Sequence, residues 1–215
     1  MKTRYLLFCF ALIAAACAAT AYFWPQLPES VPVHWDASGN VNGYGPRAVL
    51  WLLGPGMMAI VALLGAAMPG ISPRRFEIIG FESTYYYVSG VVVCLLAYVY
   101  ALTLAATLHA QVPMGRAIPA GIFMLLVLAG NPLGKVRRNF FMGIRTPWTL
   151  ASERVWYATH RLAARLMVAS GVLGLFAVWL GAPTWALLAL MLAWAPLAVA
   201  YSLLLYKRLP HQIGE

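Results

Sequence analysis

Two pairs of side chains in this sequence could do acid–base chemistry or bind a metal. The first pair is His34 and Asp36, and the second is Glu153 and His160. An imidazole and a carboxylate can exchange protons as general acid and base, and with further ligands they can hold Zn²⁺. Other possible ligands near the first pair are Glu29 and His109. No nucleophile, phosphate-binding loop or diagnostic ligand spacing accompanies either pair. We therefore predict no catalytic residue, metal or cofactor, with a membrane-embedded metal-dependent enzyme as the alternative.

The composition indicates which kind of protein must position these side chains. Of the 215 residues, 62% are hydrophobic and 10% are charged, against about 45–50% and about 25% in soluble domains. A soluble protein of this size cannot bury so much apolar surface. The composition excludes a soluble enzyme, a disordered chain and a disulfide-linked secreted domain. Cys9, Cys17 and Cys94 all lie in apolar runs, so we expect no structural disulfide in an aqueous loop.

Six apolar runs are long enough to cross a bilayer, which takes about 20 helical residues. The runs are 5–24, 48–68, 85–108, 117–134, 163–182 and 184–206. The first resembles a signal peptide but is long for one, so we expect a retained anchor. Gly54-Pro55-Gly56 is expected to kink the second run. No charged residue lies in the middle of a run, which disfavours ion-coupled transport. A small-solute or lipid transporter remains a further alternative. The predicted fold is an all-α polytopic bundle of six transmembrane helices.

The basic residues predict the orientation of this bundle. With six spans, every lysine and arginine except Arg47 and Arg116 falls on the side that holds both termini. The positive-inside rule makes that side cytoplasmic. We divide the chain into an N-terminal two-helix unit, 1–68, with an outer loop at 25–47, and a four-helix unit, 69–215. The second unit carries a basic cytoplasmic loop at 135–162.

The outer loop is expected to be a short extended segment or hairpin. In the alternating stretch 31–36, Val31, Val33 and Trp35 share one face, and Pro32, His34 and Asp36 share the other. A turn-rich stretch follows at 37–40, and Asn42-Gly43 is a favoured tight-turn pair. Packing on the helix ends must stabilise such a hairpin, because an isolated one is marginal in water.

The cytoplasmic loop is basic and unusually aromatic. Thr146 suits a helix N-cap and Pro147 a first helical position, so we predict a helix that begins at about 147 and runs into the fifth span. On it, Glu153, Trp156 and His160 would share one face. Another face would carry Arg154, Arg161 and Arg165. Three interpretations remain open: contact with anionic lipid, docking of a cytosolic protein, and catalysis by Glu153 and His160. Lipid explains the charge, so direct nucleic-acid binding is not expected.

Two stretches resemble one family. The run GIRTPWTL at 143–150, with Asn139 before it and WxxTH at 156–160 after it, resembles the signature of SdpI-type membrane proteins. The stretch PVHW at 32–35, with Gly39 and Gly43, resembles a domain of unknown function that often precedes that signature. The resemblance implies a bacterial inner-membrane immunity protein, without enzymatic activity. Such a protein counters a secreted, membrane-active peptide toxin and holds a cytosolic transcriptional repressor at the membrane.

This resemblance assigns candidate site residues at both ends of the bundle. We expect the toxin-facing residues of the outer loop to be His34, Trp35, Asp36 and Gly39. We expect the residues that face lipid or a cytosolic partner to be Asn139, Gly143, Arg145, Thr146, Pro147, Trp148, Glu153, Trp156 and His160.

Overall fold

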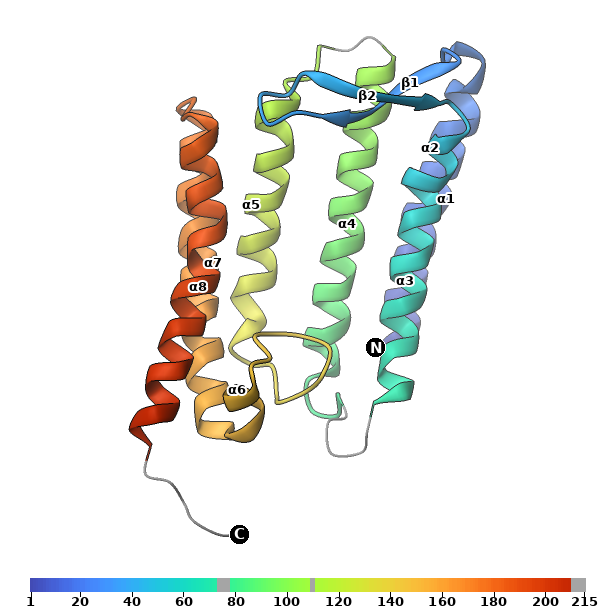
Figure 1. Cartoon of the computed structure of the whole chain (residues 1–215). Helices are drawn as coiled ribbons and strands as arrows, with labels where there is room; N and C mark the ends of the chain where they lie inside the picture. Colours follow the sequence, from blue (N-terminus) through green and yellow to red (C-terminus); the bar gives the residue numbers. More distant parts are fainter. Residues whose placement is uncertain (73–77, 109–110, 210–215) are drawn as a thin grey trace.

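The structure, a computed structural model, describes residues 1–72, 78–108 and 111–209 of the chain. Six long helices run side by side through this part of the protein, and a two-stranded sheet crosses one end of them (Figure 1). The helices are α1 (Lys2–Phe23), α2 (Val49–Trp51) with α3 (Met57–Ala67), α4 (Glu82–Thr107), α5 (Met114–Leu133), α7 (Glu153–Trp179) and α8 (Thr184–Arg208). A short helix, α6 (Pro147–Ala151), precedes α7, and the strands are β1 (Ser30–Trp35) and β2 (Val41–Pro46). Arg74, Arg75 and His109, used in the predictions above, lie outside the described residues.

The predicted spans are confirmed. Within the described ranges, six helices are long and apolar enough to cross a membrane, counting α2 and α3 as one continuous rod. Their lengths run from 20 to 27 residues, which matches the ~20 residues that a hydrocarbon core of ~30 Å requires. The protein is therefore an all-α polytopic membrane protein with one small sheet. The division into units 1–68 and 69–215 stays a prediction.

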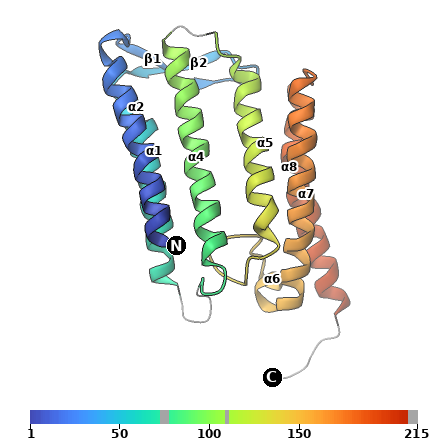
Figure 2. The same cartoon turned by 180° about the vertical axis from the view of Figure 1, so that it is seen from behind.

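The two ends of the bundle differ in character. The hairpin of β1 and β2 lies at one end, together with the turn between α7 and α8 (Figures 1 and 2). At the other end lie the N-terminus, the last turn of α8, α6 and the loop that leads into it. Every described lysine and arginine except Arg47 and Arg116 belongs to elements or helix segments on the α6 side. The two ends therefore carry very different charge.

The second span contains the predicted irregularity. Residues Leu52–Gly56 form a π-helical turn around Pro55, whose ring nitrogen has no hydrogen to donate to the helix. A Cβ added at Gly54 would overlap the ring of Tyr100, so the absence of a side chain at Gly54 lets α4 approach closely. The Tyr100 hydroxyl hydrogen-bonds Thr20 of α1, whose own hydroxyl donates to the Ala16 carbonyl at 2.7 Å. Three spans meet at this point.

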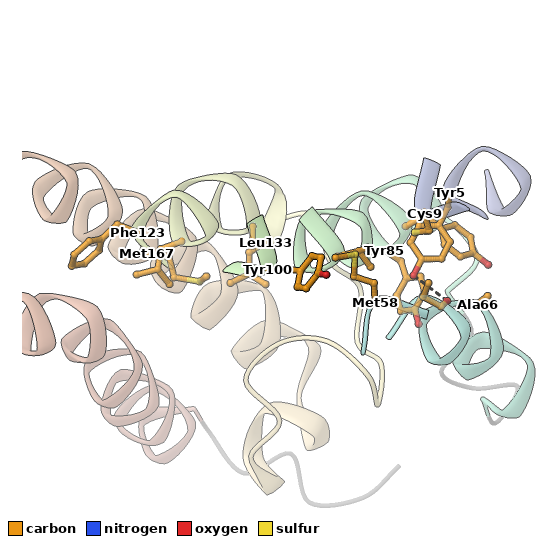
Figure 3. Packing of buried hydrophobic residues seen from close by; sticks show 14 of the residues in the cluster. Tyr5, Cys9, Met58, Ala66, Tyr85, Tyr100, Phe123, Leu133 and Met167 are labelled. Carbon is orange, nitrogen blue, oxygen red and sulfur yellow. Dashed lines mark hydrogen bonds between the residues drawn. The ribbon is translucent and has the colours of Figure 1, made fainter. Parts of the chain in front are cut away.

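The buried core runs sideways through the bundle (Figure 3). At one flank, Tyr5 of α1 donates a hydrogen bond to the Ala62 carbonyl of α3 at 3.1 Å, and Tyr85 of α4 donates to Gly65 at 2.9 Å. At the other flank, α5 and α7 approach closely, because a Cβ at Gly174 would overlap the ring of Phe123. Small residues permit such close helix contacts in lipid, where the hydrophobic effect does not drive helices together.

Candidate functional site

The central residue of the basic loop is His160, which lies in the second turn of α7. Its ring stacks on Trp156 with centroids 4.0 Å apart, and both side chains are fully buried. His160 Nδ1 donates to the Trp156 carbonyl at 2.7 Å, and Nε2 accepts from the Ile144 N–H at 3.0 Å. These partners require a neutral ring with its hydrogen on Nδ1. Because both nitrogens are occupied, His160 fixes the loop and is not positioned as a metal ligand or general base.

Gly143 allows the loop to close over this histidine. Its φ is +105°, in the region that only glycine adopts easily, and a Cβ there would overlap the His160 imidazole. Glycine is therefore required for two independent reasons, its backbone angle and its contact. The glycine of the GIRTPWTL run and the histidine that follows it form a single interlocked contact.

Asn139 organises the start of the same loop. Its side chain is fully buried and makes four hydrogen bonds to the backbone. The Oδ1 atom accepts from Phe141 at 2.7 Å and Met142 at 2.8 Å, and Nδ2 donates to the carbonyls of Arg137 at 2.7 Å and Met142 at 3.2 Å. An amide is the side chain that offers two acceptor positions and two donors together. Asn139 therefore holds this turn through four hydrogen bonds to its backbone.

The predicted N-cap at Thr146 is confirmed, but the predicted continuous helix is wrong. The Thr146 hydroxyl accepts from the Thr149 N–H at 3.3 Å, and the Thr149 hydroxyl accepts from the Thr146 N–H at 2.9 Å. Pro147 occupies the first helical position. The helix then ends at Ala151, because Ser152 is extended at φ −131° and ψ 121°. Ser152 caps the start of α7 through the Val155 N–H instead. Such local bonds from serine compete with helix continuation.

Two indole groups tie the loop to the bundle. Trp148 donates to Ser202 Oγ of α8 at 2.6 Å, and Trp156 donates to the Val136 carbonyl at 2.8 Å. The sequence did not single out Ser202, Val136 and Ile144 as members of this site. Ser202 did carry a signal, because it is a small polar residue within an apolar span that must find a partner. Val136 and Ile144 contribute backbone atoms, which no residue type reveals.

The loop therefore divides into a buried frame and an exposed surface. Asn139, Trp156 and His160 were expected to face lipid or a partner, but the structure buries all three because their polar atoms hold the backbone. Glu153 does not share their environment: its side chain is 68% exposed and lies 3.7 Å from Arg138. It forms no acid–base pair with His160. Of the expected surface residues, Gly143, Arg145, Pro147 and Glu153 are exposed.

At the opposite end, Asp36 builds the hairpin turn. Its carboxylate accepts hydrogen bonds from the Ser38 and Asn40 N–H groups, both at 2.9 Å, and from Asn40 Nδ2 at 3.2 Å. These bonds, led by the one from Asn40, lower the pKa of Asp36. The predicted hairpin is confirmed, and its turn at 36–40 lies in the stretch that was expected to be rich in turns. The Asn42-Gly43 pair lies within β2, because the Asp36 carboxylate already satisfies the earlier turn.

The faces of β1 follow the predicted alternation. Val31 is fully buried, Val33 and Trp35 are half-buried, and His34 and Asp36 are exposed. His34 Nδ1 lies 2.5 Å from Asn42 Oδ1 across the hairpin. In the ranges that the structure describes, no three His, Cys, Asp or Glu residues are grouped so that they could hold a metal. The proposal of a zinc site at His34 and Asp36 thus gains no support from the geometry.

Gly39 docks the hairpin on the helices. Its φ is +89°, and a Cβ there would overlap the backbone of Gly115 in the first turn of α5. A Cβ at Gly115 would in turn lie 2.6 Å from the Ser38 carbonyl oxygen. Thr184, at the start of α8, donates to the Ala37 carbonyl at 3.3 Å. Gly39, expected to face a toxin, places the hairpin tip over α5 and α8.

Two parts of the chain match known protein families. Residues 135–202 match the model of the SdpI/YfhL protein family, and residues 11–59 match a domain of unknown function, DUF1648. The chain is 24% identical over 160 residues to the protein called immunity protein SdpI of Bacillus subtilis (strain 168). The aligned residues make up 74% of this chain and 74% of that protein. No solved structure matches. The region 135–202, which contains the interlocked loop, α7 and much of α8, is thus similar to the SdpI/YfhL protein family, and the region 11–59 is similar to DUF1648.

Proposed function

We propose that this chain is a non-enzymatic membrane immunity protein that protects a bacterial cell from a membrane-active peptide toxin. In this proposal it lies in the cytoplasmic membrane with the hairpin outside and the basic loop inside. The similarity to immunity protein SdpI and the family match over 135–202 support the function. The charge difference between the two ends supports the orientation, since basic residues are retained on the cytoplasmic side.

The single observation that carries the proposal is the structural role of the residues in and around the GIRTPWTL run. The buried residues among them do not form a reaction centre. Asn139, Gly143, Trp156 and His160 hold one loop rigid at the cationic end of the bundle. Residues whose polar atoms are used to hold the backbone of a loop favour binding over catalysis.

The exposed part of this loop is the surface that a cytosolic partner would meet. Arg145, Arg154, Arg161 and Arg165 are all exposed there. A cationic surface favours an acidic partner or anionic lipid. We propose that it contacts the inner leaflet and can hold a transcriptional repressor, with the protein acting as a membrane-bound signal transducer.

The test is a challenge of bacteria that carry either this chain or an empty vector with a panel of membrane-active peptides. The proposal expects survival to rise against at least one peptide when the chain is present. A Gly143→Ala variant should lose protection if the rigid loop is needed, and Gly134→Ala is its control. Equal survival with and without the wild-type chain across the panel would remove the immunity function.

A further inference from the structure

A cavity of about 350 Å³ lies beneath the hairpin tip. The tip forms one wall, the start of α5 forms another, and the turn between α7 and α8 forms the third. Its lining includes Ser38, Gly39, Gly115, Arg116, Gly181 and Thr184. This volume is within the range of sites for small ligands or for a few atoms of a larger one. The contact of Gly39 with Gly115 fixes one side of the cavity.

Arg116 gives this cavity its charge. Its guanidinium lies beside Gly181, in the turn between α7 and α8, and its side chain is exposed. Across the described ranges the structure assigns it no ion pair and no hydrogen bond from its side chain. The other cation of this end, Arg47, stacks on Trp24 at 4.9 Å and donates to the Leu27 carbonyl at 3.4 Å. Among the described residues, no acidic side chain lines the cavity, so it favours a negatively charged group.

The rim of the cavity places it at the edge of the bilayer. Trp179, Leu180 and Trp185 flank the turn between α7 and α8 and are 78%, 73% and 73% exposed. Tryptophans at the ends of spans lie at the membrane–water interface, where an amphipathic peptide also lies. Such a peptide can keep its apolar side chains in lipid beside these residues and reach the cavity with a polar group.

We propose that this cavity binds a carboxylate of a membrane-active peptide, with Arg116 as the group that pairs with it. The inference rests on the proposed function and names the chemistry of its ligand. A guanidinium forms two parallel hydrogen bonds with a carboxylate, a geometry that a lysine ammonium cannot reproduce. The carboxylate belongs either to the C-terminus of the peptide or to one of its Asp or Glu side chains.

The test uses the full chain in nanodiscs of phosphatidylcholine and a synthetic amphipathic peptide of Leu, Lys and Trp residues. The peptide is made with a free C-terminal carboxylate, with a C-terminal amide, and as the amide with one added Glu. We expect the two forms with a carboxylate to bind about tenfold or more tightly than the plain amide, as a charge-assisted pair predicts. Arg116→Gln should abolish that preference, and Arg116→Lys should keep part of it.

Arg47→Gln is the matched control, because it removes the other cation of the same end and should leave the preference unchanged. Equal binding of the acid and amide forms, a preference that survives in Arg116→Gln, or no saturable binding of the acid form would each overturn the proposal. Loss of the preference when phosphatidylglycerol replaces phosphatidylcholine would assign the cavity to a lipid phosphate instead. If the Arg116→Gln chain still protects cells from the toxin, this site alone is refuted. If the wild-type chain gives no protection, the immunity function is refuted.

Discussion

The indole Nε1 of Trp148 donates a hydrogen bond of 2.6 Å to the hydroxyl of Ser202, although 54 residues separate them in the sequence. Ser202 is fully buried, and its hydroxyl also lies 2.6 Å from the Val199 carbonyl of its own helix. This pair attaches α6 to the last part of α8, at the end of the bundle that carries the basic loop. The loop that carries the family signature is thus held by both of the last two spans.

The Trp148–Ser202 pair predicts a measurable coupling. Trp148→Phe and Ser202→Ala should each lower the free energy of unfolding, and the double variant should lose less than the sum. We expect a coupling energy of about 0.5–1.5 kcal/mol, the usual net value of one hydrogen bond. Unfolding by denaturant in mild detergent measures all four proteins. Strictly additive losses would mean that the two side chains do not interact.

Gly143→Ala should destabilise the loop by about 1–3 kcal/mol or more, because alanine is strained at φ +105° and its methyl group overlaps His160. Gly134→Ala is the control. Gly134 is helical at φ −65°, and its added Cβ would lie 3.4 Å from Arg161 Cγ, an ordinary contact. Thermal unfolding should separate the two variants. Equal melting temperatures would show that the stability of the protein does not depend on the backbone conformation of Gly143.

Asn139→Ala should lower the free energy of unfolding by about 1–3 kcal/mol, since it leaves buried backbone groups without partners. Asn139→Asp should cost more, because it points a carboxylate at the carbonyls of Arg137 and Met142 and buries a charge. The exposed Asn131 on α5 provides the control substitution, Asn131→Asp. If Asn139→Asp proved as stable as Asn139→Ala, the two donated hydrogen bonds would not exist.

The hairpin turn should weaken only in strong acid. The folded pKa of Asp36 is lowered relative to an unfolded value of about 3.9, so its stabilisation is complete above the unfolded pKa. It is lost as the pH falls through the folded pKa. The amide chemical shifts of Ser38 and Asn40 should report a midpoint below ~3.9. Asp36→Asn should show no such titration, and a midpoint at or above the ordinary value would contradict the turn geometry.

The sequence predicted the spans and the hairpin because each depends on a one-dimensional property. Helix length follows from the thickness of the bilayer, and the faces of β1 follow from the alternation of Val31, Val33 and Trp35. The N-cap at Thr146 was equally local. Such features need no knowledge of which distant residues meet.

The errors share the opposite cause. The position of Asn42-Gly43 inside β2, the break at Ser152 and the burial of His160 all depend on hydrogen bonds that compete with a local preference. Asn42-Gly43 is a good turn, but the Asp36 carboxylate stabilises another. Glu153 and His160 share a helical face by their spacing, yet His160 Nε2 accepts a hydrogen bond from the Ile144 N–H instead of facing Glu153. Spacing alone does not reveal a backbone partner from another segment.

The account depends most on the hairpin lying outside the cell and α6 inside. Two cysteine variants, Ser38→Cys at the hairpin tip and Ala151→Cys at the end of α6, test this after Cys9, Cys17 and Cys94 are replaced. Both positions are exposed. A membrane-impermeant maleimide should label the Ser38→Cys protein in intact cells and the Ala151→Cys protein only after the membrane is opened. Labelling of Ala151→Cys in intact cells, with Ser38→Cys protected, would contradict the account.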